Sequence, residues 1–149
     1  MTRLDSVSSQ IVEQLRRSPQ AKQRAAALAA ARFALAKTAV DHADIMDALS
    51  MLETAGALSR QQMSRLGDLA FTLDDKYFRL KAAADEGSAS SDDYLGAFGQ
   101  ARAVAAIRYC ADDDPFVAAA EAIYEAALAT DSRDDLLKLV EAVLATRMK

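Results

Sequence analysis

The chain has 149 residues, of which 52% are apolar and 27% are charged, and its formal net charge is −4. This length fits one domain, residues 1–149, that can bury a core without disulfide or metal crosslinks. One cysteine excludes an intrachain disulfide framework, one cysteine with one histidine makes no structural zinc site, and no apolar run is long enough for a membrane span. Because the N-terminus also lacks a signal-peptide pattern, we expect a soluble, cytoplasmic protein.

The N-terminal third of the chain predicts three helices. Apolar residues at spacings of three and four predict a first helix over residues 2–17. The Ser18–Pro19 pair marks the next boundary, with the serine as N-cap of an alanine-rich helix over residues 19–40. A third helix is expected over residues 41–55, with Gly56 as its C-terminal stop.

The rest of the chain also predicts helices. An S-x-x-Q capping box at Ser59 predicts a long helix that ends before the polar loop 86–91. Residues 91–131 predict two helices joined at the acidic corner 112–115, where an Asp-Pro pair suits the N-cap and the first helical position. Ser132 begins a last helix with a strong apolar stripe. We therefore expect an all-α bundle of about six to seven antiparallel helices, arranged as helical hairpins.

The helix over residues 91–110 carries a face of small residues. They recur at spacings of three and four: Gly96, Gly99, Ala103, Ala106 and Cys110. Glycine inside a helix costs about 1 kcal/mol relative to alanine, so two on one face favour close approach of another helix. We interpret this face as a seam against a neighbouring helix, with a groove for a ligand or partner chain as the alternative. The high alanine content likewise predicts a tight core with few large side chains.

Charge is distributed unevenly along the chain. Residues 1–40 contain seven basic and two acidic residues, whereas residues 82–131 contain two basic and ten acidic residues. This polarity can be satisfied within the fold, if the basic end packs near the acidic segment, or it can attract a basic partner. Glu121 and Glu125 lie four residues apart with no Lys or Arg nearby in sequence, which favours a solvated face.

The acidic segment supplies the candidate partner-binding residues. They are Asp92, Asp93, Asp112, Asp113, Asp114, Glu121, Tyr124 and Glu125. Tyr124, together with Tyr94, is the candidate aromatic anchor, because tyrosine is enriched among the residues that dominate binding energy. The expected partner is another protein with a basic surface.

Residue types that serve catalysis or cofactor binding form no recognisable pattern. The Asp/His cluster 41–44 suits helix capping better than a metal, because the first turn of a helix attracts acidic side chains. Cys110 is expected to be a buried structural thiol, and Glu121 with Glu125 lacks the Glu-x-x-His motif of di-metal bundles. Basic residues in the helix 19–40 are too sparse to indicate nucleic-acid binding. We expect no enzymatic activity, no cofactor, no metal, and neither nucleic acid nor membrane as partner.

Three functional hypotheses follow from these patterns. The first is a non-enzymatic inhibitor or immunity-type protein that neutralises a partner through an acidic helical surface. The second is a helical scaffold or oligomeric subunit, such as a homodimer, that packs through its small-residue face or another exposed stripe. The third is a helical bundle that binds a small molecule between its helices.

Overall fold

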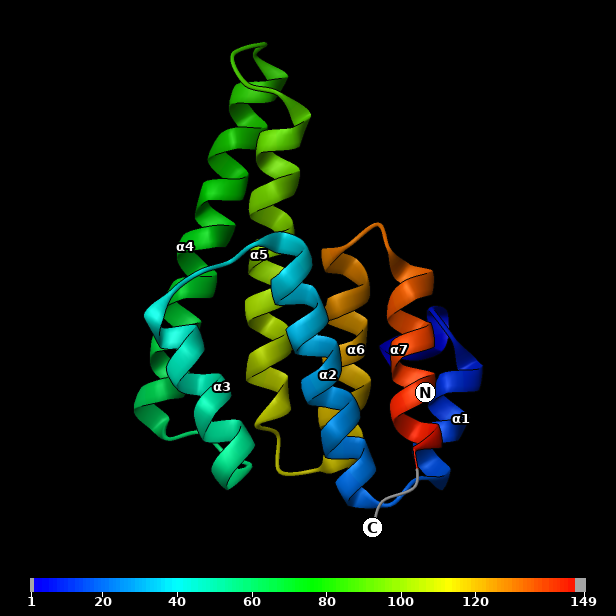
Figure 1. Ribbon diagram of the computed structural model, residues 1–149. Helices are drawn as coiled ribbons and strands as arrows, with labels where there is room; N and C mark the ends of the chain where they lie inside the picture. The colour runs from blue at the N-terminus through cyan, green and yellow to red at the C-terminus, as the bar shows by residue number, and fades with distance from the viewer. Residues whose placement is uncertain (1, 147–149) are drawn as a thin grey trace.

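The computed structural model describes residues 2–146, which contain helices and no strand (Figure 1). The elements are η1 (Arg3–Ser6), a 3-10 helix, and the α-helices α1 (Ser9–Arg17), α2 (Gln20–Thr38), α3 (Ala43–Ala55), α4 (Arg60–Asp85), α5 (Ser91–Cys110), α6 (Pro115–Ala129) and α7 (Arg133–Ala145). The helices pack against one another as a bundle, which confirms the predicted fold class. Within this part of the chain, no helix combines the length and the apolar character needed to cross a membrane.

Three helices form the centre of the bundle. Helices α2, α5 and α6 all pack on one another, α7 lies against α2, and α1 with η1 closes the side next to α6. Helix α4 packs along α5, while α3 contacts α4 and α5 over short stretches. Figure 1 shows that the α4–α5 hairpin rises beyond the ends of the other helices. The upper part of this hairpin is therefore covered by fewer neighbours than the rest.

The core consists largely of alanine, as predicted. More than half of the buried hydrophobic residues are alanine, and they are densest in α2 and α6. Alanine lets helices approach closely, because its side chain is a single methyl group. The large side chains that are fully buried are few, namely Leu4, Ile11, Leu15, Ile45, Leu66, Ile107, Ile123 and Leu136, with some valines.

The first predicted helix is two elements in the structure. A turn separates η1 from α1, so the prediction of one helix over residues 2–17 is wrong. Ser8 has an extended backbone (φ −159°, ψ 102°), and its hydroxyl accepts a hydrogen bond from the Ile11 amide (3.2 Å). A serine that caps locally thus interrupts the helix, although the apolar spacing continues across the break.

Two further helices begin later than predicted. Pro19, and not Ser18, occupies the N-cap position of α2, and the Ser18 hydroxyl donates to the carbonyl oxygen of Gln14 (2.6 Å). Helix α3 starts after His42, whose Nδ1 accepts a hydrogen bond from the Asp44 amide (3.1 Å). The capping role of this Asp/His cluster is confirmed, with the cap one residue beyond the expected Asp41.

Other helix ends agree with the sequence patterns. Gly56 ends α3 in the left-handed conformation (φ 70°), and Ser59 begins α4 with the predicted capping box. Ser90 caps α5, and Asp114 with Pro115 begins α6. Capping requires contacts among only four or so adjacent residues, so sequence alone reveals it.

Candidate functional site

The eight predicted partner-binding residues do not form one surface. Asp92 and Asp93 lie in the first turn of α5, whereas the corner 112–114 follows the last turn of the same helix. Helix α5 has 20 residues and is therefore about 30 Å long. The two acidic groups consequently lie at opposite ends of the molecule, the first at the top and the second at the bottom of Figure 1.

Glu125 is buried in a network of ion pairs. It is 2% exposed; its Oε1 lies 3.1 Å from a terminal guanidinium nitrogen of Arg3, and its Oε2 lies 3.2 Å from one of Arg102. Arg102 also reaches Asp74 on α4 (3.4 Å). The expectation that Glu121 and Glu125 form a solvated face is wrong, because arginines from η1 and α5 fold over them. Glu125 is not available to a partner.

Arg3 also contacts the other two predicted partner-binding residues of α6, Glu121 and Tyr124. Its Nε donates to Glu121 Oε2 (2.9 Å), and its guanidinium lies 4.4 Å from the centre of the Tyr124 ring. Hydrogen bonds to Glu121 and then to Glu125 raise the pKa of Arg3, so this residue stays charged. The basic N-terminal segment therefore neutralises part of the acidic segment within the fold, which is one of the two outcomes expected from the charge distribution.

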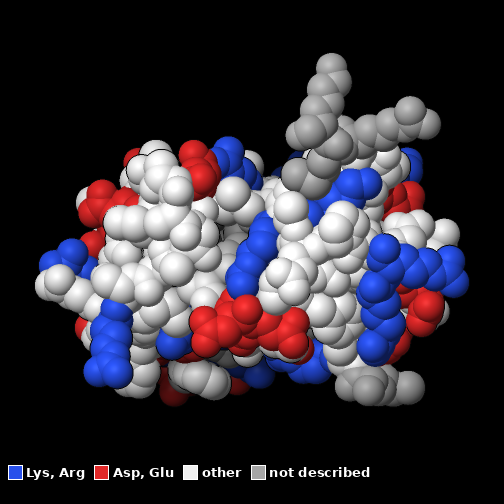
Figure 2. All heavy atoms as spheres, turned by 90° about the horizontal axis from the view of Figure 1, so that it is seen from below, with Lys and Arg blue, Asp and Glu red and all other residues white. Residues whose placement is uncertain are grey.

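The acidic corner 112–114 is also bound within the fold. Asp114 Oδ1 accepts hydrogen bonds from the amides of Phe116 and Val117, and Asp112 Oδ1 accepts one from the Asp114 amide. Arg24 donates to three backbone oxygens of this connection, those of residues 110, 112 and 113 (2.5–3.2 Å). Figure 2 views this end of the molecule and shows acidic side chains near the centre with basic side chains beside them. The mixture of signs makes this end a weak attractor for a basic partner.

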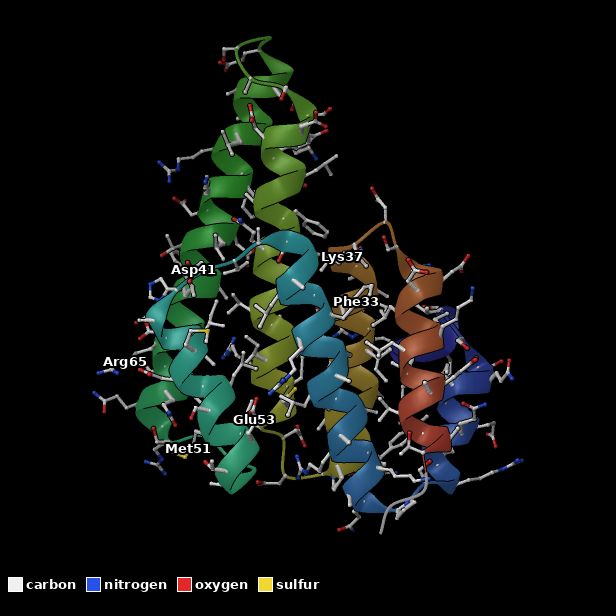
Figure 3. All side chains as sticks on the ribbon, viewed as in Figure 1. Phe33, Lys37, Asp41, Met51, Glu53 and Arg65 are labelled. Atoms are coloured by element: carbon white, nitrogen blue, oxygen red, sulfur yellow. The ribbon has the colours of Figure 1, made fainter. Side chains whose placement is uncertain are left out.

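A groove lies at the upper end of the bundle, where α5 rises above α2 and α6. Its volume is about 440 Å³, and its lining residues are Lys37, Leu95, Gly96, Phe98, Gly99, Leu128, Ala129, Thr130, Asp131 and Ser132. We call this set the upper groove. Its lining combines apolar side chains, including Leu95, Phe98 and Leu128, with polar ones, and Leu95 is 55% exposed although it is a large aliphatic side chain. Figure 3 places Lys37 at the upper end of α2.

The face of small residues on α5 is packed against α6 at Gly99 and open to the groove at Gly96. A Cβ added at Gly99 would lie 3.0 Å from the carbonyl oxygen of Ala129, so this glycine does permit close approach of α6. A Cβ at Gly96 would meet nothing within 4 Å. The seam interpretation is therefore confirmed at Gly99, where the helices touch, and is wrong at Gly96, which faces the groove.

The two glycines give a direct test of this assignment. Gly96→Ala is expected to raise the free energy of unfolding by about 0.5–1 kcal/mol, because alanine is the better helix residue and its methyl group has room. Gly99→Ala is expected to lower it, because the methyl group would press on Ala129 and on Thr38 Cγ2 at 3.3 Å. Urea denaturation measures both. Changes of the same sign in the two variants would contradict the assignment.

A second cavity, of about 390 Å³, lies beside the ion-pair network between α4 and α5. Asp74, Arg102, Arg108, Tyr109 and Glu125 are among its lining residues. Three of these lining residues, Asp74, Arg102 and Glu125, bind one another, as described above. We therefore assign this cavity to the packing of α4 on α5 and base no function on it.

Among residues 2–146, no three His, Cys, Asp or Glu side chains lie close enough together to hold a metal ion. No protein-family model matches the sequence, and comparisons with curated proteins and with solved structures likewise find no match. The upper groove is therefore the candidate site on the strength of its own geometry.

Proposed function

We propose that this chain is a non-enzymatic protein-binding domain of the inhibitor or immunity type, and that its upper groove receives a basic, amphipathic segment of the partner. The observation that carries the proposal is the exposure of Leu95 and Gly96 side by side at the upper groove, just above the point where α5 becomes packed. An exposed leucine offers apolar contact area, and a glycine without a neighbour lets a second backbone come close.

The rim of the upper groove favours a cationic partner. Asp92 lies four residues before Gly96, so it projects from the same face of α5 one turn further up. Asp131 lines the groove from the α6–α7 connection, and both aspartates are exposed. Lys37 is the opposing charge, and its ammonium group lies 5.5 Å from the centre of the Phe33 ring. The apolar side chains of the lining and the two aspartates together match a segment that carries aliphatic side chains flanked by lysine or arginine.

The size of the upper groove limits what it can hold. A volume of about 440 Å³ lies within the range of small binding pockets. It accommodates a few side chains of a partner rather than an entire helix. The remaining contact area would come from the adjoining surface of the hairpin, and a partner whose own activity depends on the bound basic segment would be inhibited.

A photo-crosslinking experiment tests the proposal. A photoreactive phenylalanine analogue at position 95 is expected to capture a partner protein in cells, whereas the same analogue at Leu139, an exposed position on α7, is the matched control. The captured protein is then purified and titrated against the wild-type chain and against Gly96→Trp, in which the indole fills the groove.

We expect Gly96→Trp to weaken binding at least tenfold and Asp92→Lys with Asp131→Lys to remove most of its salt dependence. Circular dichroism should show both variants to be folded, because these positions are exposed or face open space. A partner that is captured equally from position 139, or that binds Gly96→Trp with unchanged affinity, would exclude the upper groove as the binding site.

A further inference from the structure

Helix α4 leaves a long face without cover. It has 26 residues, and only two of them, Leu66 and Ala70, are buried. Its outward stripe, at spacings of three and four, consists of Gln61, Ser64, Asp68, Phe71, Asp75, Phe78 and Ala82, all of them exposed. Phe71 is 74% exposed and Phe78 is 66% exposed, which are the highest values among the large hydrophobic side chains that the structure describes.

The two phenylalanines lie on one face of α4. They are seven residues apart, so they project from the same side of α4, about 10 Å from each other along its axis. A pair of aromatic side chains exposed to this extent is costly in water, because each ring can bury roughly 150–250 Å². Such a pair in a regular helix therefore indicates a surface that is covered by another molecule.

The two ends of the hairpin differ in charge. Arg60 and Arg65 lie in the first turns of α4, at the base, and Figure 3 shows Arg65 projecting away from the bundle. The tip carries four acidic residues within a short stretch: Asp85, Glu86, Asp92 and Asp93. Between these ends α4 carries both signs, namely Asp68, Asp74, Asp75, Lys76, Arg79 and Lys81. The arginines at the base and the excess of acidic residues at the tip favour an antiparallel over a parallel arrangement of two hairpins.

We propose that the outer face of α4 binds a second copy of this chain in an antiparallel, twofold-symmetric dimer. The register places Phe71 of one copy against Phe78 of the other, which occurs twice by symmetry. A twofold axis between antiparallel helices brings each flank of one helix to the same flank of the other. On the flank beside the phenylalanines, Arg65 then lies within one helical turn of Glu86 of the other copy, and Asp68 lies within one turn of Arg79 of the other copy.

In this register the charge of Asp75 opposes association, and Arg79 compensates for it. Asp75 lies near the twofold axis, so two aspartates approach each other there. Each of them is paired with Arg79 of its own helix, whose Nε lies 3.1 Å from Asp75 Oδ2. The arginines neutralise the pair, and their remaining donors reach toward Asp68 of the opposite copy.

The contact made by one helix is small, so a weak dimer is expected. Helix α4 is about 39 Å long, which allows an interface near the lower end of those seen in specific dimers. We therefore expect a dissociation constant of the order of micromolar. The face contains none of the residues that line the upper groove, and neither phenylalanine takes part in the proposed function. Substitutions at Phe71 and Phe78 therefore test the dimer, whereas Gly96→Trp tests the proposed function.

Sedimentation equilibrium between 1 and 200 µM tests the association, and these concentrations bracket the expected constant. The wild-type chain is expected to dimerise, and Phe71→Glu with Phe78→Glu is expected to weaken dimerisation at least a hundredfold. Both positions are exposed, so the variant should retain its circular dichroism spectrum. Leu139→Glu, an exposed aliphatic residue on α7, is the matched control and should dimerise as the wild type does. A wild-type chain that is monomeric at the highest concentration would overturn the proposal.

Disulfide formation tests the register. Ser64→Cys and Asp85→Cys are exposed positions that the antiparallel register brings opposite each other, whereas each lies about 30 Å from its own counterpart. We expect a crosslink when the two variants are mixed and none within either variant alone. Burial raises the pKa of the natural Cys110 to about 12, so this thiol stays protonated and does not compete near pH 8. Crosslinking of each variant with itself would indicate a parallel arrangement and would overturn the proposed register.

Discussion

Replacement of Arg102 by methionine is expected to lower the free energy of unfolding by about 3 kcal/mol. Glu125 keeps a 3.1 Å contact with Arg3 in this variant, but the Arg3 side chain is 45% exposed and solvent screens it. The buried carboxylate, with 3% of its side chain exposed, thus loses the partner that shields it best. Urea denaturation of the wild type and the variant measures the difference.

The control for this prediction is an ion pair of the same chemistry on the surface. Arg79→Met breaks the pair with Asp75, whose two side chains are 72% and 55% exposed, and should cost less than about 0.5 kcal/mol. Combining Arg102→Met with Glu125→Leu should cost less than Arg102→Met alone, because no carboxylate then remains buried. Similar losses for Arg102→Met and Arg79→Met would show that the burial of Glu125 has little energetic effect.

Ile123→Ala is expected to lower the free energy of unfolding by about 4 kcal/mol, near the upper end for truncation of a core aliphatic side chain. Ile123 is 0% exposed and lies in α6, between alanine-rich helices. The cost of a cavity depends on how well its surroundings can collapse into it. Methyl groups on rigid helices cannot extend into the space, so most of the cavity should remain.

A graded series separates cavity formation from general effects on α6. Ile123→Val removes one methyl group and should cost about 1 kcal/mol. Leu139→Ala, at a position on α7 that is 37% exposed, should cost less than about 1 kcal/mol because solvent already reaches it. A loss for Ile123→Ala no greater than that for Leu139→Ala would mean that the alanine core repacks and closes the cavity.

Most of the fold could be predicted from local patterns. The caps at Gly56, Ser59 and Asp114 involve residues within one turn of each other, so their hydrogen bonds are independent of the rest of the chain. The break at Ser8 shows the limit of this reasoning. The spacing of apolar residues continues across Ser8, so it predicts one helix. The serine that caps α1 was the signal for a break at this position.

The candidate site was harder to predict, because it depends on where helices end in space. Gly96 and Gly99 lie on one face of α5 and are equivalent by spacing. Helix α6 ends at Ala129, so its last turn reaches Gly99 and leaves Gly96 open. Sequence reasoning named the groove as an alternative but had no means of choosing between the two glycines.

Composition and short-range spacing are enough to indicate that this chain forms capped, alanine-rich helices with a basic beginning and an acidic later segment. Which of the acidic side chains are buried depends instead on how the helices pack. Arg3 and Glu121 are separated by 118 positions in the chain, yet η1 packs on α6 and joins them. The strength of a charge interaction depends on distance and surrounding dielectric, and both are properties of the packed bundle and not of residue order.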